Sequence, residues 1–326
     1  MFRFSHIIML FALFAFAGCE KVIDFDPGEV EPYVVMVSRP ESDSLVNVYL
    51  MQSRFFLDHS YAYYDSDNDY RQTYITDATV TLWVAGSSYS GVLQQKEGKQ
   101  YYQFGVRPQP GDSLYIEATV PGHDGKVSSG TRIPTLPDFE LIELSELADD
   151  GGYKLRFKLK SGQTREYYSV SLQTWGEVSY FDSVTGSYIT EIDSTGENSQ
   201  HYYFDVNDPI VNNMDVTTAF DGDDGSFHGS EMLFSNELFS NGEHEFTLEF
   251  DQGYRPYLET YVEDLPIYLV VSKLTPELYK YKMTLRAQDN SDDLFGEPVQ
   301  VFSNISGGIG IFAGSSQKRL RMTINR

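Results

Sequence analysis

Residues 153–160 read Tyr-Lys-Leu-Arg-Phe-Lys-Leu-Lys, a strict alternation of apolar and basic side chains. Successive side chains of a β-strand point to opposite faces of its sheet, so this period of two predicts a strand with one buried and one solvent-facing side. The same alternation returns at residues 46–50, 78–84, 114–120, 246–250 and 320–324, and residues 267–271 form a more continuously apolar run. The chain is therefore predicted to be all-β.

The basic side of this first segment has two interpretations. Its four cations, Lys154, Arg156, Lys158 and Lys160, would suit lipid phosphates or an acidic partner. Pairing with acidic side chains on neighbouring strands is the simpler expectation.

Turn-forming clusters of Gly, Asn, Asp and Ser separate the strands in the first part of the chain. About 100 residues of short strands without a helical pattern are typical of a β-sandwich, which we place at residues 33–136. The segment Ile133-Pro134-Thr135-Leu136-Pro137 then interrupts the pattern, because prolines disfavour both helix and central strand. Residues 137–326 are predicted to form a second, C-terminal β-rich domain.

One helix is expected in this second domain, near residues 275–288. Thr275 supplies a capping hydroxyl, Pro276 suits the first helical position and Glu277 places an acid in the first turn. An apolar stripe that would pack against a sheet is formed by Leu274, Leu278, Tyr281 and Leu285.

The composition excludes two classes of protein. The 326 residues carry 24 Lys and Arg against 48 Asp and Glu, a formal net charge of −24. Such a surface repels a polyanion, so nucleic acid is not expected as a partner. With 41% hydrophobic and 22% charged residues, the chain has enough apolar side chains for packed cores, which excludes intrinsic disorder.

Residues 1–18 are predicted to be a lipoprotein signal peptide. Arg3 precedes the apolar run of residues 7–17, which is too short to span a bilayer but matches the hydrophobic region of a secretory signal. The run ends in a lipobox-like junction, Phe16-Ala17-Gly18-Cys19. Cys19 is the only cysteine of the chain and is the predicted lipidation site, whose acyl chains would anchor the protein stably. The alternatives are an incidental cysteine after an ordinary signal peptide, or an uncleaved anchor.

Residues 19–32 are predicted to be a lipidated tether that lifts the folded part off the membrane. The stretch is acidic and leads through Pro27 and Gly28 to Pro32. Acidic residues just after a lipidated cysteine also resemble the export signals that send some Gram-negative lipoproteins to the cell surface. The expected location is therefore the outer membrane, with the protein held by its lipid and exposed at the cell surface.

Tyrosines crowd two polar stretches and are candidate ligand-binding or partner-binding residues. They are Tyr61, Tyr63, Tyr64, Tyr70 and Tyr74 in the first stretch, and Tyr180 and Tyr188 in the second. Tyrosine offers a large amphipathic contact area at low cost in conformational entropy. The alternative is a long β-hairpin with ordinary cross-strand packing.

Two acidic loops are candidate calcium sites, formed by Asp65, Asp67 and Asp69 and by Asp221, Asp223 and Asp224. Carboxylate oxygens in a flexible loop are the hard ligands that calcium prefers. Tyr70 and Thr76, however, stand where a calcium loop has its glycine and its closing glutamate. Solvated acidic turns are commoner, so calcium is the one cofactor considered and no other is expected.

The enzyme motifs are incomplete, and the chain is expected not to be an enzyme. Residues 86–90 lack the second glycine of a nucleophile elbow, and His244-Glu245 lacks the second histidine of a zinc-protease helix. Residues 308–313, Gly-Ile-Gly-Ile-Phe-Ala, match a dinucleotide-binding pattern by spacing, but a strand instead of a helix is expected to follow. We interpret these glycines as turn or bulge positions.

Two segments carry a family resemblance. Residues 293–305, Asp-Leu-Phe-Gly-Glu-Pro-Val-Gln-Val-Phe-Ser-Asn-Ile, continue into the glycine-rich residues 308–314, and residues 19–24 read Cys-Glu-Lys-Val-Ile-Asp. Together they resemble the Gram-negative lipoprotein family named domain of unknown function 4249. The resemblance implies a β-rich outer-membrane lipoprotein, often encoded beside a TonB-dependent transporter, and it carries over no catalytic residues. Residues 304–314 are expected to be structural, as a strand, a glycine-rich turn and a second strand.

These features together predict a non-enzymatic outer-membrane lipoprotein that acts as an accessory or ligand-capture subunit of a TonB-dependent transporter. A stand-alone structural or adhesive envelope lipoprotein is one alternative, and a hydrolase without a recognisable motif is another. A deep pocket with converging carboxylates of perturbed pKa would favour the hydrolase. An exposed aromatic patch without a pocket would favour partner binding.

Overall fold

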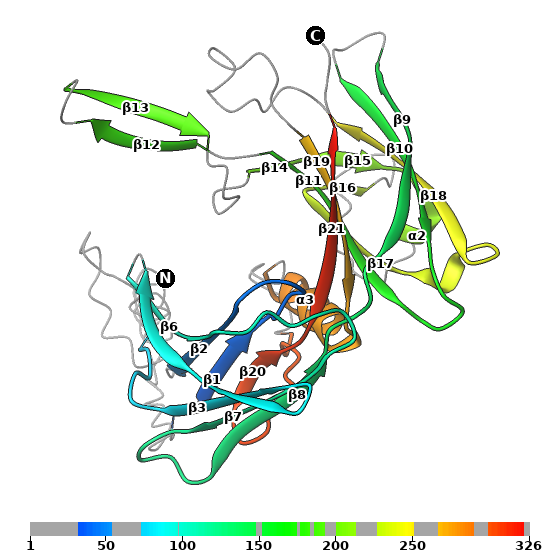
Figure 1. Cartoon of the computed structure of the whole chain (residues 1–326). Coiled ribbons are helices and arrows are strands. Elements are labelled where there is room, and N and C mark those ends of the chain that lie inside the picture. The colour runs from blue at the N-terminus through cyan, green and yellow to red at the C-terminus, as the bar shows by residue number, and fades with distance from the viewer. Residues whose placement is uncertain are drawn as a thin grey trace, which may run out of the picture. The chain divides into compact units, whose positions relative to one another are not determined.

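The computed structural model describes ten stretches of the chain, residues 32–53, 73–96, 98–147, 152–174, 177–182, 186–192, 200–212, 227–250, 267–289 and 299–322. Strands dominate these residues, which also hold two short α-helices (Figure 1). The strands pair almost entirely in antiparallel fashion into several sheets. The prediction of an all-β, multi-sheet protein is therefore confirmed.

The first sandwich contains a five-stranded sheet with the order β20-β1-β2-β6-β5. Its strands are β1 (Val34–Ser38), β2 (Val46–Gln52), β5 (Val92–Lys96), β6 (Lys99–Phe104) and β20 (Ile309–Phe312). The neighbours are antiparallel except for β1 and β20, which run parallel. An edge position of this sheet is thus filled by a strand from the far end of the sequence.

The opposing sheet has the order β4-β3-β7-β8. Its strands are β3 (Thr79–Val84), β4 (Ser87–Ser90), β7 (Ser113–Thr119) and β8 (Lys126–Arg132). Alternate residues of both sheets, such as Met36 and Val48 from one and Leu82 and Ile116 from the other, are buried in a single hydrophobic cluster. This shared core is what two sheets packed face to face require.

The glycine-rich C-terminal segment ties the two sheets of the first sandwich together. Ser306 exchanges two backbone hydrogen bonds with Ser128 of β8 (2.8 and 2.9 Å), and a few residues later β20 pairs with β1. The Asn304 side chain donates to the Phe312 carbonyl oxygen (2.8 Å) and accepts from the Phe312 N–H (2.9 Å). These glycines therefore serve the fold and open no helix, as the sequence interpretation held.

Gly310 shows why this segment needs glycine. Its φ is +119°, a conformation that side chains with a Cβ rarely adopt, and an added Cβ would collide with the Met36 carbonyl oxygen. Only Ala313 and Gly314 separate β20 from the strand that follows, so the chain passes directly from a sheet of the first sandwich into a sheet of the second. The predicted domain division at residues 136 and 137 stays a prediction.

One sheet of the second sandwich has the order β16-β15-β18-β10-β9. Its strands are β9 (Asp138–Glu146), β10 (Tyr153–Lys160), β15 (Phe204–Val206), β16 (Phe227–Gly229) and β18 (Glu243–Phe250). Along β10 the apolar residues are buried and their neighbours are not, as the alternation predicts. A register shift between Arg156 and Phe157 interrupts the pairing of β10 with β9.

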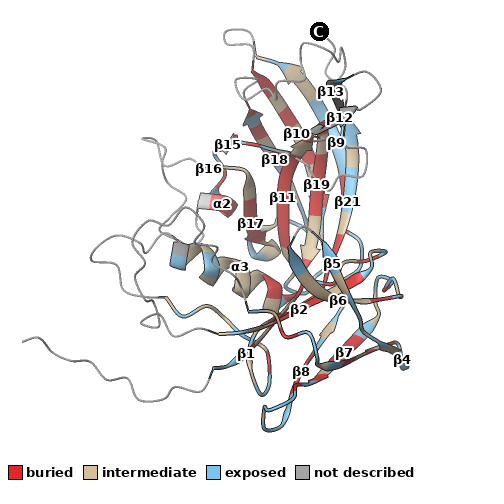
Figure 2. Ribbon diagram, turned by 90° about the vertical axis from the view of Figure 1, so that its left-hand side faces the viewer, coloured by how far each residue is buried: buried red, intermediate tan, exposed pale blue. Residues whose placement is uncertain are grey.

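The other sheet has the order β14-β11-β19-β21, with β17 also paired to β11. Its strands are β11 (Tyr167–Thr174), β14 (Gln200–Tyr202), β17 (Glu231–Ser235), β19 (Ile267–Leu274) and β21 (Ser315–Met322). Phe157 and Phe246 of the first sheet share one buried cluster with Leu172 and Val271 of this one. Figure 2 shows that β11 and β19 are mostly buried, whereas the edge strand β21 keeps exposed and intermediate residues.

The remaining elements are small. Strands β12 (Glu177–Asp182) and β13 (Ser187–Ile192) form a two-stranded hairpin. Helix α2 spans Pro209–Asn212, and a single 3-10 turn spans Asn236–Leu238. None of the helices among the described residues is long and apolar enough to cross a bilayer.

Helix α3 (Pro276–Asp289) occupies the position expected for the helix near residues 275–288. The Thr275 hydroxyl caps it by accepting a hydrogen bond from the Leu278 N–H (3.3 Å). Leu274 and Leu278 are buried in a third cluster, together with Ile311. Leu285 is 36% exposed, so the apolar stripe is one residue shorter than predicted.

The cations of β10 are all paired with acids on the two flanking strands. Lys154 lies 3.9 Å from Glu249, Lys158 lies 3.5 Å from Glu243, and Lys160 lies 3.5 Å from Glu140. Arg156 bridges both neighbours, to Glu143 of β9 (3.0 Å) and to Glu245 of β18. The expectation that this basic stripe pairs within the sheet is confirmed.

Candidate functional site

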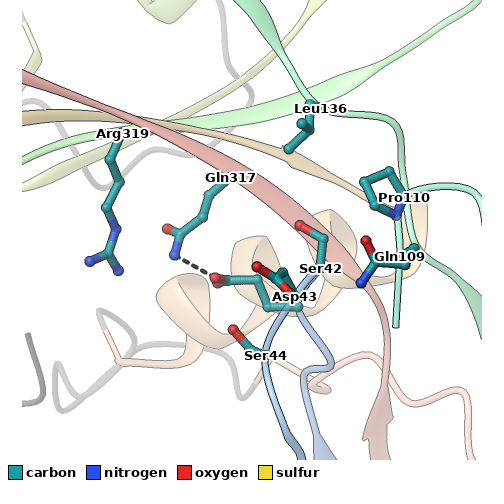
Figure 3. A pocket seen from close by; sticks show the side chains of 9 residues that line it. Ser42, Asp43, Ser44, Gln109, Pro110, Leu136, Gln317 and Arg319 are labelled. Atoms are coloured by element: carbon teal, nitrogen blue, oxygen red, sulfur yellow. Dashed lines mark hydrogen bonds between the residues drawn. The ribbon is translucent and has the colours of Figure 1, made fainter. Parts of the chain in front are cut away.

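A pocket of about 450 Å³ lies where distant parts of the chain meet (Figure 3). Its lining comes from the turn between β1 and β2, the loop after β6, the segment before β9, and β21. These residues are Glu41, Ser42, Asp43, Ser44, Gln109, Pro110, Leu136, Gln317 and Arg319. Most of the lining is polar or charged, and only Pro110 and Leu136 are apolar, so the site suits a small polar ligand better than an apolar one.

Backbone hydrogen bonds hold the turn that forms one side of this pocket. The Ser42 N–H donates to the Ser315 carbonyl oxygen of β21 (3.0 Å), and the Asp43 N–H donates to the Pro108 carbonyl oxygen (2.8 Å). The Asp43 carbonyl oxygen in turn accepts from the Arg107 guanidinium (2.7 Å). Asp43 itself adopts φ +59°, a left-handed conformation that aspartate tolerates better than most residues. Hydrogen bonds within the protein therefore hold this wall of the pocket in place without a ligand.

Glu41 is one of the two acids of the pocket, with Asp43, and is only partly exposed. The Gln317 side-chain amide donates a hydrogen bond to its carboxylate. Burial raises the pKa of Glu41 above its usual range, and attraction to Arg319 and the hydrogen bond from Gln317 offset this effect only in part. The carboxylate is thus poorly compensated in this structure.

Arg319 is the cation of the pocket and is exposed. It forms no ion pair within the part of the chain that the structure describes. Gln317 and Arg319 project from the same side of β21 (Figure 3), and the Gln317 amide donates a hydrogen bond to Glu41. The pocket thus holds two acids, Glu41 and Asp43, and one cation, Arg319, which forms no direct ion pair with either of them.

A second pocket of about 340 Å³ contains a more buried cluster of titratable groups. The Lys273 ammonium donates to Glu166 (2.5 Å) and to the Thr135 hydroxyl (3.1 Å). The Tyr168 hydroxyl donates to the other oxygen of Glu166 (2.5 Å). These bonds fasten the segment around Thr135 to the second sandwich, so the cluster has a structural explanation.

The groups of this cluster shift one another's pKa values in the directions expected for hydrogen-bonded partners. Burial favours a higher pKa for Glu166, but the hydrogen bonds and charge of Lys273, with the Tyr168 hydroxyl, outweigh it and hold the pKa below its usual range. Burial and the neighbouring Glu166 carboxylate raise the pKa of Tyr168. Tyr168 therefore stays a neutral donor.

His244 and Asp208 form a partly buried pair with a role in the fold. The His244 Nε2 atom lies 2.8 Å from one Asp208 oxygen, and the other oxygen accepts from the Ile210 N–H of α2 (2.8 Å). The His244 ring packs against Phe239 and Phe246 (centroids at 5.5 and 4.6 Å). His244 lies on a strand, so its sequence pairing with Glu245 is not a zinc-protease helix.

Of the tyrosines singled out in the sequence, three lie among the described residues. Tyr74 forms an isolated bridge to Met51 and is partly buried. Tyr180 pairs with Ile189, and Tyr188 pairs with Phe181, so this stretch forms the hairpin that was the alternative to a binding loop. The other tyrosines, Tyr61, Tyr63, Tyr64 and Tyr70, lie outside the described residues. A binding role for these residues stays a prediction.

The calcium candidates Asp65, Asp67, Asp69, Asp221, Asp223 and Asp224 also lie outside the described residues, as does the lipidation site Cys19. Within the described ranges, no three His, Cys, Asp or Glu side chains gather closely enough to hold a metal ion. Calcium binding and lipidation therefore remain predictions.

The sequence did not single out Glu41, Gln317 and Arg319 as a site. They come from two segments more than 270 positions apart, as the separation of 276 between Glu41 and Gln317 shows. The one local signal was the alternation of Arg319 and Arg321 with apolar residues, which places both arginines on one face of a strand.

Comparison with protein families places the chain. A family described as Domain of unknown function (DUF4249) matches residues 20–321. The chain belongs to this family. The match covers both sandwiches of the DUF4249 protein, including the glycine-rich segment that carried the resemblance in the sequence. No curated protein matches the chain at a significant level.

Proposed function

We propose that this DUF4249 protein is a non-enzymatic outer-membrane lipoprotein that captures a ligand for a TonB-dependent transporter. The observation that carries this proposal is the lipobox-like segment Phe16-Ala17-Gly18-Cys19, which holds the only cysteine of the chain. The family match begins at residue 20, directly after that cysteine. Lipid attached to Cys19 would leave the whole family region outside the bilayer.

The pocket at Glu41 and Arg319 supports ligand capture over a purely structural role. It offers opposite charges, two side-chain amides and apolar walls in one concave site.

Lipid attachment is tested first, by growing cells with an alkyne-labelled fatty acid and detecting label on the protein. The wild-type chain should carry label and sediment with outer membranes, and Cys19→Ser should lose both. Ser5→Ala, in the signal segment but away from the junction, is the matched control and should behave like the wild type. An unlabelled wild-type protein would contradict the proposal.

The transporter partnership is tested by purifying the tagged protein from its own gently solubilised outer membranes, followed by mass spectrometry. A TonB-dependent transporter recovered in near-equal amount is the expected result. A tagged outer-membrane lipoprotein of unrelated sequence serves as the control for unspecific recovery. Recovery of the DUF4249 protein alone would overturn the accessory role and favour a stand-alone envelope lipoprotein.

A further inference from the structure

We propose that the pocket between the β1–β2 turn and β21 binds the charged main chain of a small peptide or amino acid. In this arrangement Arg319 faces the ligand carboxylate and Glu41 faces the ligand ammonium. The inference rests on the proposed function in so far as it names the captured ligand, but the binding site can be tested without the transporter.

The charged side chains of the pocket, Arg319 and Glu41, favour a ligand that carries both charges. Arg319 has no ion pair within the described residues, although the cations of β10 are all paired. A guanidinium matches the geometry of a carboxylate and can donate two parallel hydrogen bonds to it. Glu41 is desolvated, and only Gln317 donates to it within the described residues. An ammonium group would supply the compensation that this carboxylate lacks.

The second argument excludes ligands with a single charge. A phosphate or other plain anion attracted by Arg319 would be repelled by Glu41 and Asp43, and a plain cation would leave Arg319 without a carboxylate. The net charge of −24 further disfavours anionic ligands. A zwitterion is the small-molecule class whose two charges both find an opposite partner in this pocket.

The third argument concerns the uncharged lining. Gln317 uses its amide NH₂ group toward Glu41, which leaves its amide oxygen as an acceptor for a peptide N–H. Pro110 and Leu136 supply apolar surface, and Leu136 is 52% exposed, an area that a ligand side chain would cover. An amide acceptor between two charges, next to apolar walls, suits a main chain with side chains attached.

The test is calorimetric titration of the purified full-length protein in detergent. The probes are trialanine, N-acetyl-trialanine, trialanine amide and the doubly blocked peptide. We expect trialanine to bind, each single block to weaken binding at least about tenfold, and the doubly blocked peptide to bind least. Equal binding of the blocked and free peptides, or no binding of any probe, would overturn the assignment.

Chain length then separates the two sources of a zwitterion. Tightest binding of alanine would identify a free amino acid as the ligand, and tightest binding of di-, tri- or tetra-alanine would identify a peptide. Both results support the pocket assignment, because both require the two charged ends. Affinity that rises with length even for doubly blocked peptides would contradict it.

Variants localise the binding to this pocket. Arg319→Gln and Glu41→Gln should each weaken trialanine binding at least about fivefold. The matched controls are Arg321→Gln, two positions along the same face of β21, and Glu146→Gln on β9; neither residue lines the pocket. Unchanged binding in Arg319→Gln, which lies on the surface and should fold normally, would overturn the assignment.

The pocket assignment and the transporter partnership can each be overturned without the other. Loss of peptide binding with a recovered transporter would overturn the pocket assignment alone. Peptide binding without a recovered transporter would overturn the accessory role and leave the pocket in place.

Discussion

Strands β10 and β21 both carry cations on the solvent-facing side of a sheet, yet within the described part of the chain only those of β10 form ion pairs. The reason is position in the sheet. Strand β10 lies between β9 and β18, which place glutamates beside its cations, whereas β21 is an edge strand whose single neighbour β19 offers Val270 opposite Arg319. A cation of this acidic protein is therefore paired where a neighbouring strand places an acid beside it, and Arg319 has no such ion-pair partner among the described residues although it lies in a pocket with two acids.

A third set of charges is more buried than those of β10 and β21 and should have the largest effect on the free energy of unfolding. Glu231 of β17 pairs with Lys282 (2.6 Å) and Arg286 (2.9 Å) of α3. Glu231→Gln should leave both cations without their anion and lower the free energy of unfolding by about 2–3 kcal/mol. Urea unfolding of the purified protein measures this loss.

The control for this prediction is Glu277→Gln. Glu277 lies on α3, the helix that carries Lys282 and Arg286, but it forms no ion pair among the described residues. It should change the free energy of unfolding by less than about 0.5 kcal/mol. Equal losses in the two variants would mean that the buried cluster contributes no more than ordinary helix surface.

On acidification, the pocket acid Glu41 should take up its proton before the acids of the buried pairs, because its pKa is raised and theirs are lowered. Burial alone would raise the pKa of Glu231, but Lys282 and Arg286 outweigh this effect, so its pKa lies below the usual value of 4.5, as does that of Glu166. Groups with a lowered folded pKa stabilise the protein above their unfolded pKa, and this stability is lost as pH falls through the folded pKa. Stability should therefore fall below pH 4.5, and less steeply in Glu231→Gln. Urea titrations across this range would contradict the account if the two slopes were equal.

The paired face of β10 illustrates how much of the fold the sequence predicts. Alternation within residues 153–160 was enough to predict a strand and to place its cations on one side. The helix at Thr275-Pro276 was equally local, because capping and the first turn depend on adjacent residues. The sequence could not predict which acids pair with Arg156, because Glu245 lies 89 positions away and its place depends on the strand register.

Strand β20 and the pocket were harder to predict for the same reason. Residues 309–312 were assigned to the C-terminal part of the chain, and their parallel pairing with β1 is a contact that no local pattern encodes. The pocket likewise combines Glu41, Gln109 and Arg319. Each looks like an ordinary surface residue in its own segment, so only the assembled fold gives it significance.

Breaking the paired face should cost less than breaking the buried cluster. Arg156→Gln removes contacts with Glu143 and Glu245, but these side chains are more than a third exposed. We expect only a small loss in the free energy of unfolding, because solvent screens such pairs. The loss should shrink in 1 M salt, where the Debye length is about 3 Å. A loss that does not change with salt would contradict the electrostatic explanation.

The pocket acid Glu41 should affect the pH dependence of stability in the opposite direction to Glu231 and Glu166. The pKa of Glu41 is raised mainly by burial, so its carboxylate opposes folding at neutral pH, and the penalty disappears as pH falls through the folded pKa. Glu41→Gln should therefore stabilise the protein at pH 7, by roughly 0.5 kcal/mol, while it weakens ligand binding. Thermal unfolding at pH 7 and at pH 4 measures this gain, which should be smaller at pH 4. A destabilised variant at pH 7 would show that Glu41 serves the fold instead of a ligand.

The central claim is that Arg319, which has no ion-pair partner among the residues that the structure describes, meets the carboxylate of a zwitterionic ligand. The most direct measurement is a cycle that crosses Arg319→Gln with trialanine and trialanine amide in the same calorimetric titrations. Amidation should weaken binding about tenfold or more in the wild type and should make almost no difference in Arg319→Gln, whose free energy of unfolding stays within about 0.5 kcal/mol of the wild type. An amidation penalty of the same size in both proteins would show that the carboxylate does not meet Arg319, and it would contradict the account.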